Sequence, residues 1–351
     1  MNAKQVNPEM LVLARESRGL TQAELAQKTG IGQSLLSKYE HGMLEVSDQV
    51  LTEIATALNY PESLFSCSEP IRGLGSSCMH YRKRQSLPVR DLKEIQANAN
   101  LAGIRFRRLL LSVEIQAQRD FPRYDIADYG DARRIAMMVR NAWGIPLGPI
   151  KNLVATIERA GGIVLPLHFQ TRKLDAVSQW PDEMPPLFFI NMNMPWDHIR
   201  FSLAHEIGHI IMHMFPGAEQ EQEADLFASE LLMPSRDIAA DLGGMSLVKA
   251  AQLKPYWRVS MQALIRRAYD LGKISKRQYS RLFTQLSRLG YRINEPVDIS
   301  PEEPETYRRL IDVHLHDFEY TVGDLSRLLY ISPSELDEKY LRRAGGIGIV
   351  K

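Results

Sequence analysis

Two histidines stand four residues apart near the middle of the chain, in the pentapeptide HEIGH at residues 205–209. Residues i and i+4 of an α-helix lie on the same face, so His205 and His209 can hold one metal ion through their imidazole nitrogens. Glu206 lies beside them, where its carboxylate can take a proton from water. This H-E-x-x-H spacing is typical of zinc peptidases. The alternative is an ordinary buried helix with two packed histidines.

A catalytic zinc site uses three protein ligands, so one more is needed. The segment EQEQEADLFASELLMP at residues 219–234 offers four glutamates, Glu219, Glu221, Glu223 and Glu230. Glu221 and Asp225 are one helical turn apart and resemble the E-x-x-x-D pair of gluzincins of the thermolysin type. That resemblance implies that Glu221 completes the metal site and that Asp225 orients the first histidine from behind.

The sequence from HEIGH through ExEADxFAxxLLMP resembles the ImmA/IrrE metallo-endopeptidases, over about residues 133–236. The resemblance implies a zincin-like (gluzincin) core with a short β-sheet, Zn²⁺ as the cofactor and Glu206 as the catalytic base. It also implies cleavage of very few cytosolic proteins, typically transcriptional repressors that control mobile elements or stress genes. His213 extends the same helix face, and we expect it to support the site, because two histidines and one glutamate already fill it.

The sequence PLFFIN at residues 186–191 precedes the histidine helix and has the composition of a β-strand. Further strand candidates are residues 163–167 and 174–179. Zinc peptidases with this motif usually carry an edge strand before the helix, and substrate backbone pairs with it. We therefore expect a substrate-binding edge strand formed by Leu187, Phe188, Phe189, Ile190 and Asn191. The alternative is an internal strand that carries only core residues.

The first 66 residues predict five short helices, at about 10–18, 22–29, 33–41, 47–58 and 61–65. Thr21 and Glu24 are spaced as a capping box, and Glu40 is placed to pair with Arg15. The segment LTQAELAQKTGIGQSLLSKYEHG resembles the helix-turn-helix of the phage-repressor (Cro/C1, or XRE) family. That resemblance implies double-stranded DNA as a partner. The residues implied are Gln22 at a phosphate and, facing the major groove, Gln33, Ser34, Ser37 and Lys38.

The charge of this N-terminal region limits how strongly it can bind DNA. Residues 1–66 contain five Lys/Arg against eight Asp/Glu, which gives a net charge of −3. Because neutralisation of phosphates supplies most non-specific affinity, we expect weak binding from residues 1–66 alone. The alternative is a remnant that binds protein or forms a dimer.

Two later regions are basic. Residues 67–125 hold eleven Lys/Arg against six Asp/Glu, with a polar linker at 66–77, a basic cluster at 79–84 and a long helix at about 88–117. Residues 246–292 hold eleven Lys/Arg and one acid, with six aromatic residues among them. This second region fits single-stranded nucleic acid or an acidic protein as a partner. The alternative is a solvated helical face whose aromatic residues belong to the core.

The expected helices and strands predict an α+β protein that is mostly α, and its length of 351 residues predicts two or three domains. The expected parts are an XRE-type domain at 1–66, a basic linker and long helix at 67–125, a zincin-like core at 126–240 and a helical C-terminal region at 241–351. No apolar run reaches transmembrane length and the first thirty residues are not a signal peptide. With only two cysteines, a cytoplasmic protein with reduced thiols and no membrane partner is expected.

The sequence therefore predicts a zinc-dependent endopeptidase that is coupled to DNA binding. Its expected substrate is a repressor-type regulator encoded nearby, and a homodimer is left open. One alternative is a helix-turn-helix transcriptional regulator whose zinc fold is structural or regulatory. Another is a toxin–antitoxin component with the same chemistry. Glu206 argues for the enzyme, because a structural metal site needs no base.

Overall fold

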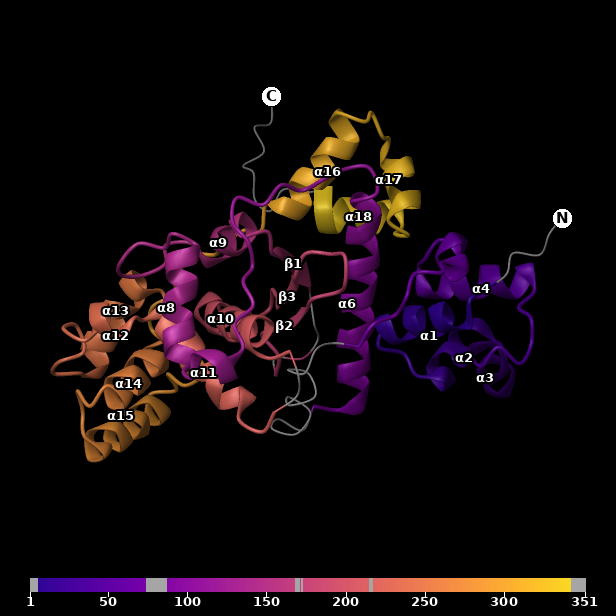
Figure 1. The fold of residues 1–351 in the computed structure, drawn as a ribbon. Coiled ribbons are helices and arrows are strands. Elements are labelled where there is room, and N and C mark those ends of the chain that lie inside the picture. Colours follow the sequence, from indigo (N-terminus) through magenta and orange to yellow (C-terminus); the bar gives the residue numbers. More distant parts are fainter. Residues whose placement is uncertain (1–5, 74–86, 168–170, 172, 215–216, 342–351) are drawn as a thin grey trace, which may run out of the picture. The chain divides into compact units, whose positions relative to one another are not determined.

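The computed structural model describes residues 6–73, 87–167, 171, 173–214 and 217–341, which fall into two compact units (Figure 1). Among these residues, the first unit contains 6–73, 87–115 and 306–341, and the second contains 116–305. The expected regions 67–125 and 241–351 are therefore each divided between the two units. The basic cluster at 79–84 lies outside the described residues.

The first unit begins with the expected series of short helices. They are α1 Pro8–Ser17, α2 Gln22–Thr29, α3 Gln33–Glu40, α4 Asp48–Leu58 and the 3₁₀-helix η1 Glu62–Ser66. The capping box of Thr21 and Glu24 is present at the start of α2. Gly30 ends that helix with φ 73°, a left-handed conformation that glycine adopts without steric cost.

The long helix α6 completes the core of this unit. It spans Val89–Leu109 and ends earlier than the expected residue 117. Ala97, Leu101 and Ile104 of α6 belong to the same buried cluster as Leu11 and Leu36 of the N-terminal helices. The apolar core of the N-terminal helices therefore extends beyond residue 66.

Three short helices and a π-helix from the end of the chain also belong to the first unit. They are α16 Thr306–His316, α17 Val322–Leu328, α18 Pro333–Leu336 and η2 Asp337–Leu341. Arg105 of α6 donates to the backbone carbonyl of Leu329 at 3.1 Å, and Phe106 stacks on Tyr307 with ring centroids 6.4 Å apart. Residues 306–341 thus pack on α6 within the same unit.

The second unit contains the remaining helices and the β-sheet. Its elements are α7 Ile126–Tyr129, α8 Ala132–Ala142, α9 Leu153–Arg159, β1 Ile163–Leu167, β2 Ala176–Gln179, β3 Leu187–Asn191, α10 Trp196–Met212, α11 Gln220–Leu232, α12 Ser235–Ile238, α13 Leu247–Trp257, α14 Met261–Asp270 and α15 Lys276–Arg288. One apolar core joins the sheet to helices from α8 to α15. The chain as described is mostly helical with a small sheet, which agrees with the expected α+β, mostly α class. Among the described residues, no helix combines the length and apolarity needed to cross a membrane.

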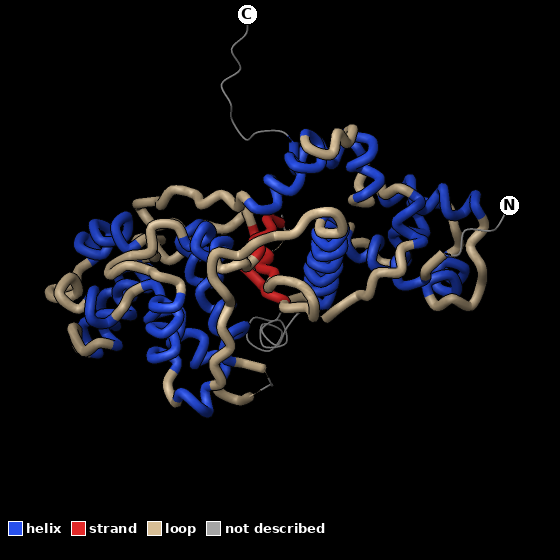
Figure 2. Tube along the Cα trace, turned by 45° about the horizontal axis from the view of Figure 1, so that its top comes forward, coloured by secondary structure: helices blue, strands red, loops and turns tan. Residues whose placement is uncertain are grey.

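The three strands, drawn in red in Figure 2, form one sheet in the order β1-β3-β2. β3 runs parallel to β1 and antiparallel to β2, with Phe188 opposite Val164 on one side and Ser178 on the other. The expectation of a substrate-binding edge strand at Leu187–Asn191 is therefore wrong. Every residue of β3 is buried, which suits a continuous apolar run in a central strand. The alternative of an internal strand is the one observed.

Buried ion pairs attach the C-terminal helices of this unit to α10 and α11. Lys254 of α13 donates to Asp197 of α10 at 2.7 Å. Arg267 of α14 pairs with Glu230 of α11, and both side chains are buried. Trp257 is also in the core. These three residues of the 246–292 region are buried and therefore cannot contact a nucleic acid. Trp257 fits the alternative in which the aromatic residues belong to the core, whereas the solvated face expected there for the basic residues does not describe Lys254 and Arg267.

A bidentate ion pair in the first unit generates a prediction about acid stability. Arg18, the residue that follows α1, donates to both carboxylate oxygens of Glu335 in α18, at 2.8 and 3.2 Å. Burial raises the pKa of Glu335, but the bonds from Arg18 and Lys339 outweigh it and lower the pKa from 4.5 to about 2. A carboxylate with a depressed folded-state pKa stabilises the fold above its unfolded pKa and loses this effect as pH falls.

We expect Glu335→Gln to lower the melting temperature at neutral pH, because it removes the charge that Arg18 and Lys339 bind. The difference from the wild type should shrink as pH falls from about 4.5 to about 2. Thermal unfolding followed by circular dichroism across this pH range measures it. The matched control is Glu338→Gln on neighbouring η2. A difference that stays constant down to pH 2 would contradict the assignment.

Candidate metal centre and recognition helix

Helix α10 places the two histidines of the HEIGH motif on one buried face. His205 and His209 are 7% and 4% exposed, and their Nε2 atoms lie 2.9 Å apart. Both rings therefore present the same nitrogen to one point, as two imidazole ligands of one ion must. The i, i+4 spacing on a helix is sufficient to produce this arrangement.

Helix α11 brings a carboxylate to the same point. Oε1 of Glu221 lies 3.2 Å from Nε2 of His209, and Oε2 lies 3.7 Å from Nε2 of His205. One donor atom from each of the three residues falls within 4.8 Å of the others. Zinc ligands at about 2.0–2.1 Å in a tetrahedral arrangement stand about 3.3 Å apart. The donor set and its spacing therefore fit a zinc ion with three protein ligands.

The approach of α11 to α10 depends on Gly208, the fourth residue of the motif. A Cβ atom built at this position would lie 3.1 Å from Cδ1 of Phe227 and 3.3 Å from Cα of Ala224. Both contacts belong to α11, and Ala224 is in the helical turn that follows Glu221. A side chain at residue 208 would require Phe227 and the backbone at Ala224 to shift by a few tenths of an ångström, on the helix that carries Glu221.

Asp225 lies behind the first histidine, as the resemblance implies. Its Oδ1 is 2.9 Å from Nδ1 of His205, which leaves Nε2 to face Glu221. Burial lowers the pKa of His205, but the hydrogen bond to Asp225 and the charges of Glu206, Asp225 and Glu221 outweigh it and raise the pKa. The acidic surroundings also favour a bound cation.

Glu206 is 1% exposed and lies on the same helix as the two histidines. Its Oε2 accepts a hydrogen bond of 2.5 Å from the hydroxyl of Ser178 in β2. The sequence analysis did not single out Ser178. The only available signal was a hydroxyl residue inside a strand candidate that is otherwise apolar, at residues 174–179. The hydroxyl restricts the orientation of the carboxylate that is the candidate base.

His213 is the residue after the last turn of α10, and its ring folds back against the site. Nδ1 of His213 lies 2.9 Å from Nδ1 of His209, and Nε2 lies 2.9 Å from Oε2 of Glu223. The expectation that His213 supports the site agrees with this position. Glu223, considered only as a possible ligand from the sequence, contacts His213 instead.

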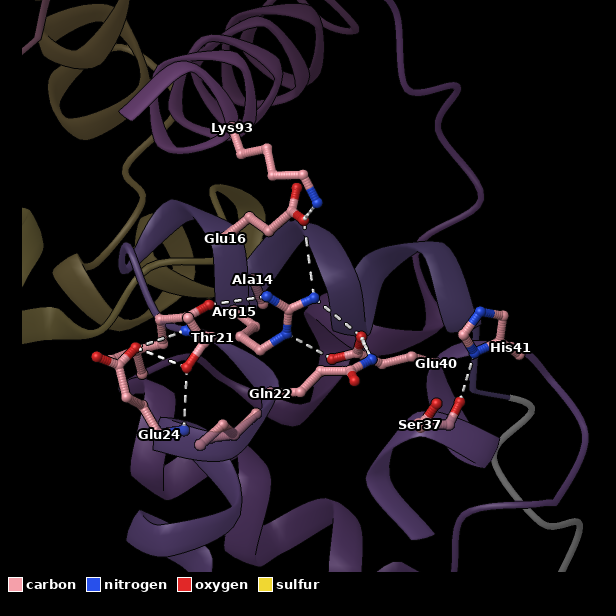
Figure 3. Close-up of polar contacts among 12 residues, drawn as sticks. Ala14, Arg15, Glu16, Thr21, Gln22, Glu24, Ser37, Glu40, His41 and Lys93 are labelled. Atoms are coloured by element: carbon pink, nitrogen blue, oxygen red, sulfur yellow. Dashed lines mark hydrogen bonds and ion pairs between the residues drawn. The ribbon is translucent and has the colours of Figure 1, made fainter. Parts of the chain in front are cut away.

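The implied DNA-contacting residues all lie on α2 and α3 of the first unit. Gln22 and Ser37 are labelled in Figure 3. On α3, Gln33, Ser34 and Lys38 are exposed, and Ser37 is half-buried. Gln22 is half-buried too, because its side-chain amide donates to Glu40 at 2.8 Å. The side-chain amide of Gln22, which the resemblance assigns to a phosphate, is therefore already hydrogen-bonded to Glu40 of α3.

The pairing of Arg15 with Glu40, expected from the sequence, holds α1 to α3. Nε of Arg15 lies 2.6 Å from one carboxylate oxygen and Nη2 lies 2.9 Å from the other. Lys93 of α6 adds a bond of 2.8 Å to Glu16, beside Arg15 (Figure 3). Helix α3, which carries four of the implied DNA-contacting residues, is thus held to α1 by a buried, bidentate ion pair, the geometry in which such pairs are strongest.

Comparison with known proteins gives two matches and one negative result. Residues 157–269 match the model of a peptidase family described as the IrrE N-terminal-like domain. Residues 11–65 match the helix-turn-helix family model. A search of curated proteins finds no match to the chain. Two segments of the chain thus match a helix-turn-helix family and an IrrE N-terminal-like peptidase family, in agreement with the resemblance to the ImmA/IrrE metallopeptidases.

Proposed function

We propose that this protein is a zinc-dependent endopeptidase that cleaves a specific protein, with its activity coupled to DNA binding by the first unit. The observation that carries the proposal is the convergence of donor atoms from His205, His209 and Glu221 beside the buried carboxylate of Glu206. The match to a peptidase family over residues 157–269 supports it. A helical bundle without such a function has no need to bury these polar groups together.

The proposed reaction is hydrolysis of a peptide bond. When bound by the two histidines and Glu221, zinc supplies Lewis-acid polarisation of a carbonyl and activation of water. Glu206 takes the proton from the attacking water and passes it to the amine that leaves, so the protons balance across the step. Ser178 holds the carboxylate of Glu206 through the bond of 2.5 Å.

The substrate backbone is proposed to pair with β2 instead of β3. β2 is bonded to β3 on one side, and among the described residues no strand pairs with its other side. It also packs on α10 and carries Ser178, which contacts Glu206. An extended peptide added to this edge by backbone hydrogen bonds would therefore pass next to the base.

The proposed substrate is a repressor-type regulator encoded nearby, and the helix-turn-helix of the first unit supplies the link to DNA. Zinc and a zincin-like fold of the second unit belong to the same proposal. The rival function is a transcriptional regulator whose metal centre is structural. The buried Glu206 favours the peptidase, because a structural zinc site is closed by its ligands and requires no proton acceptor.

We expect one zinc ion per chain in the wild type and loss of stoichiometric zinc in Glu221→Gln, because an amide is a poorer metal ligand than a carboxylate. Elemental analysis after dialysis against a weak chelator measures the ratio. Glu219→Gln is the matched control, since it removes an exposed acid just before α11. Retention of zinc by Glu221→Gln would mean that another group completes the site.

Glu206→Gln should keep zinc and the folded structure but lose peptidase activity by at least about 100-fold, because only the proton acceptor is removed. The measurement is the appearance of new protein N-termini in cells that produce wild type or variant. If every new N-terminus found with the wild type also appeared with Glu206→Gln, other proteases would account for the cleavage and the proposal would be contradicted. If Glu206→Gln controlled transcription as the wild type does, the rival function of a transcriptional regulator with a structural metal centre would be favoured.

For DNA binding, we expect Lys38→Ala in the full chain to weaken binding to duplex DNA and to reduce the salt dependence by about one phosphate contact. Lys38 is exposed on α3, where its charge can reach the backbone of the groove. Lys28→Ala is the control, because this exposed lysine lies at the far end of α2 from Gln22. Fluorescence anisotropy at several salt concentrations gives both slopes. Equal slopes for the two variants would contradict the assignment.

A further inference from the structure

Three side chains form a hydrogen-bonded series behind the second histidine of the metal centre. Nδ1 of His209 faces Nδ1 of His213 at 2.9 Å, and Nε2 of His213 faces a carboxylate oxygen of Glu223 at 2.9 Å. The side chain of His213 is 2% exposed, and that of Glu223 is 21% exposed. The series therefore runs from the metal centre through a buried ring to a partly exposed acid.

We propose that Glu223 and His213 are positioning residues that fix the tautomer of His209 and so keep its Nε2 lone pair directed at the metal. This inference rests on the proposed metal centre. Neither residue is a ligand, because His205, His209 and Glu221 already supply the three donor atoms that converge.

The positions of the protons follow from the contacts. A metal ligand at Nε2 of His209 requires that its ring proton sit on Nδ1. That proton must be donated, and the atom it faces is Nδ1 of His213, which must therefore be unprotonated. The proton of the neutral His213 ring is then on Nε2, where it is donated to the carboxylate of Glu223. With Glu223 ionised, this arrangement of protons satisfies both hydrogen bonds and leaves no proton on Nε2 of His209.

The carboxylate makes this arrangement the stable one. An ionised acid accepts hydrogen bonds and donates none, so Glu223 holds the proton of His213 on Nε2. Without it, His213 can place the proton on Nδ1, where it meets Nδ1 of His209. His209 must then move its own proton to Nε2, and the nitrogen that faces Glu221 becomes a donor that cannot bind metal.

The two histidine ligands are therefore oriented by different means. Asp225 contacts Nδ1 of His205 directly at 2.9 Å, whereas Glu223 acts on His209 through one intervening ring. The end of α10 explains this difference. His213 leaves the helix with φ −113° and ψ 81° while its backbone N–H still donates to the carbonyl of His209. The ring of His213 therefore stays against the last turn of α10, which carries His209.

The first test measures zinc affinity in the full chain by competition with a chromophoric chelator. Loss of a residue that orients a metal ligand typically costs 10–100-fold in affinity, and we expect His213→Leu and Glu223→Ala to weaken zinc binding by about this factor. Glu223→Gln, which keeps an acceptor but loses the charge, should lie between them and the wild type. Glu219→Ala is the control and should bind zinc as the wild type does. Equal affinity in all four variants would overturn the proposal.

The second test separates a tautomer effect from a loss of packing. Nitrogen-15 spectra of histidine-labelled, metal-free protein report which ring nitrogen of His209 carries the proton. We expect Nδ1–H in the wild type and in Glu219→Ala, and a shift toward Nε2–H in Glu223→Ala. If Glu223→Ala bound zinc more weakly while the His209 tautomer stayed unchanged, the proposed control of that tautomer by Glu223 and His213 would be overturned. If the wild-type chain bound no zinc, the proposed function would be contradicted. The His209 tautomer in the metal-free protein would still show whether Glu223 and His213 control the position of its proton.

Discussion

The close packing of α10 on α11 is the constraint on which the rest of the second unit depends. At Gly208 the two helices approach until a Cβ atom would lie within 3.3 Å of the backbone of α11. This approach lets one helix contribute the two histidines and the candidate base Glu206 while the other contributes Glu221, Asp225 and Glu223. A metal centre of this kind requires both helices at fixed distance and rotation, because ligand positions tolerate errors of only a few tenths of an ångström.

The sequence predicted the parts of the site that depend on spacing along one helix. The pair His205 and His209 and the pair Glu221 and Asp225 are each separated by four residues, and helix geometry alone places each pair on one face. Ser178 and the position of β3 depend instead on strand order. No spacing in the sequence reports strand order, so a central strand with five buried residues was mistaken for an edge.

The same distinction explains the basic residues of the C-terminal helices. A count of eleven Lys/Arg against one acid in residues 246–292 ignores the acids that other segments supply. Lys254 is bound by Asp197 and Glu295, and Arg267 by Glu230, all of which lie outside that range. Buried cations need such partners because desolvation of an unpaired charge is costly. Charge counts along a sequence thus describe a surface only after the buried pairs have been removed.

The connectivity of the chain links the stability of the two units. Residues 116–305 of the second unit are inserted between α6 and α16, which both belong to the first unit. The core of the N-terminal helices includes Ala97, Leu101 and Ile104 of α6, while α16 and α17 return to pack on that helix. The first unit can therefore close only when chain segments on both sides of the insertion come together. Folding of the inserted unit, which brings those segments within reach of each other, lowers the entropy cost of this closure. The stability of the N-terminal helices, including α3, would in this way depend on an intact second unit.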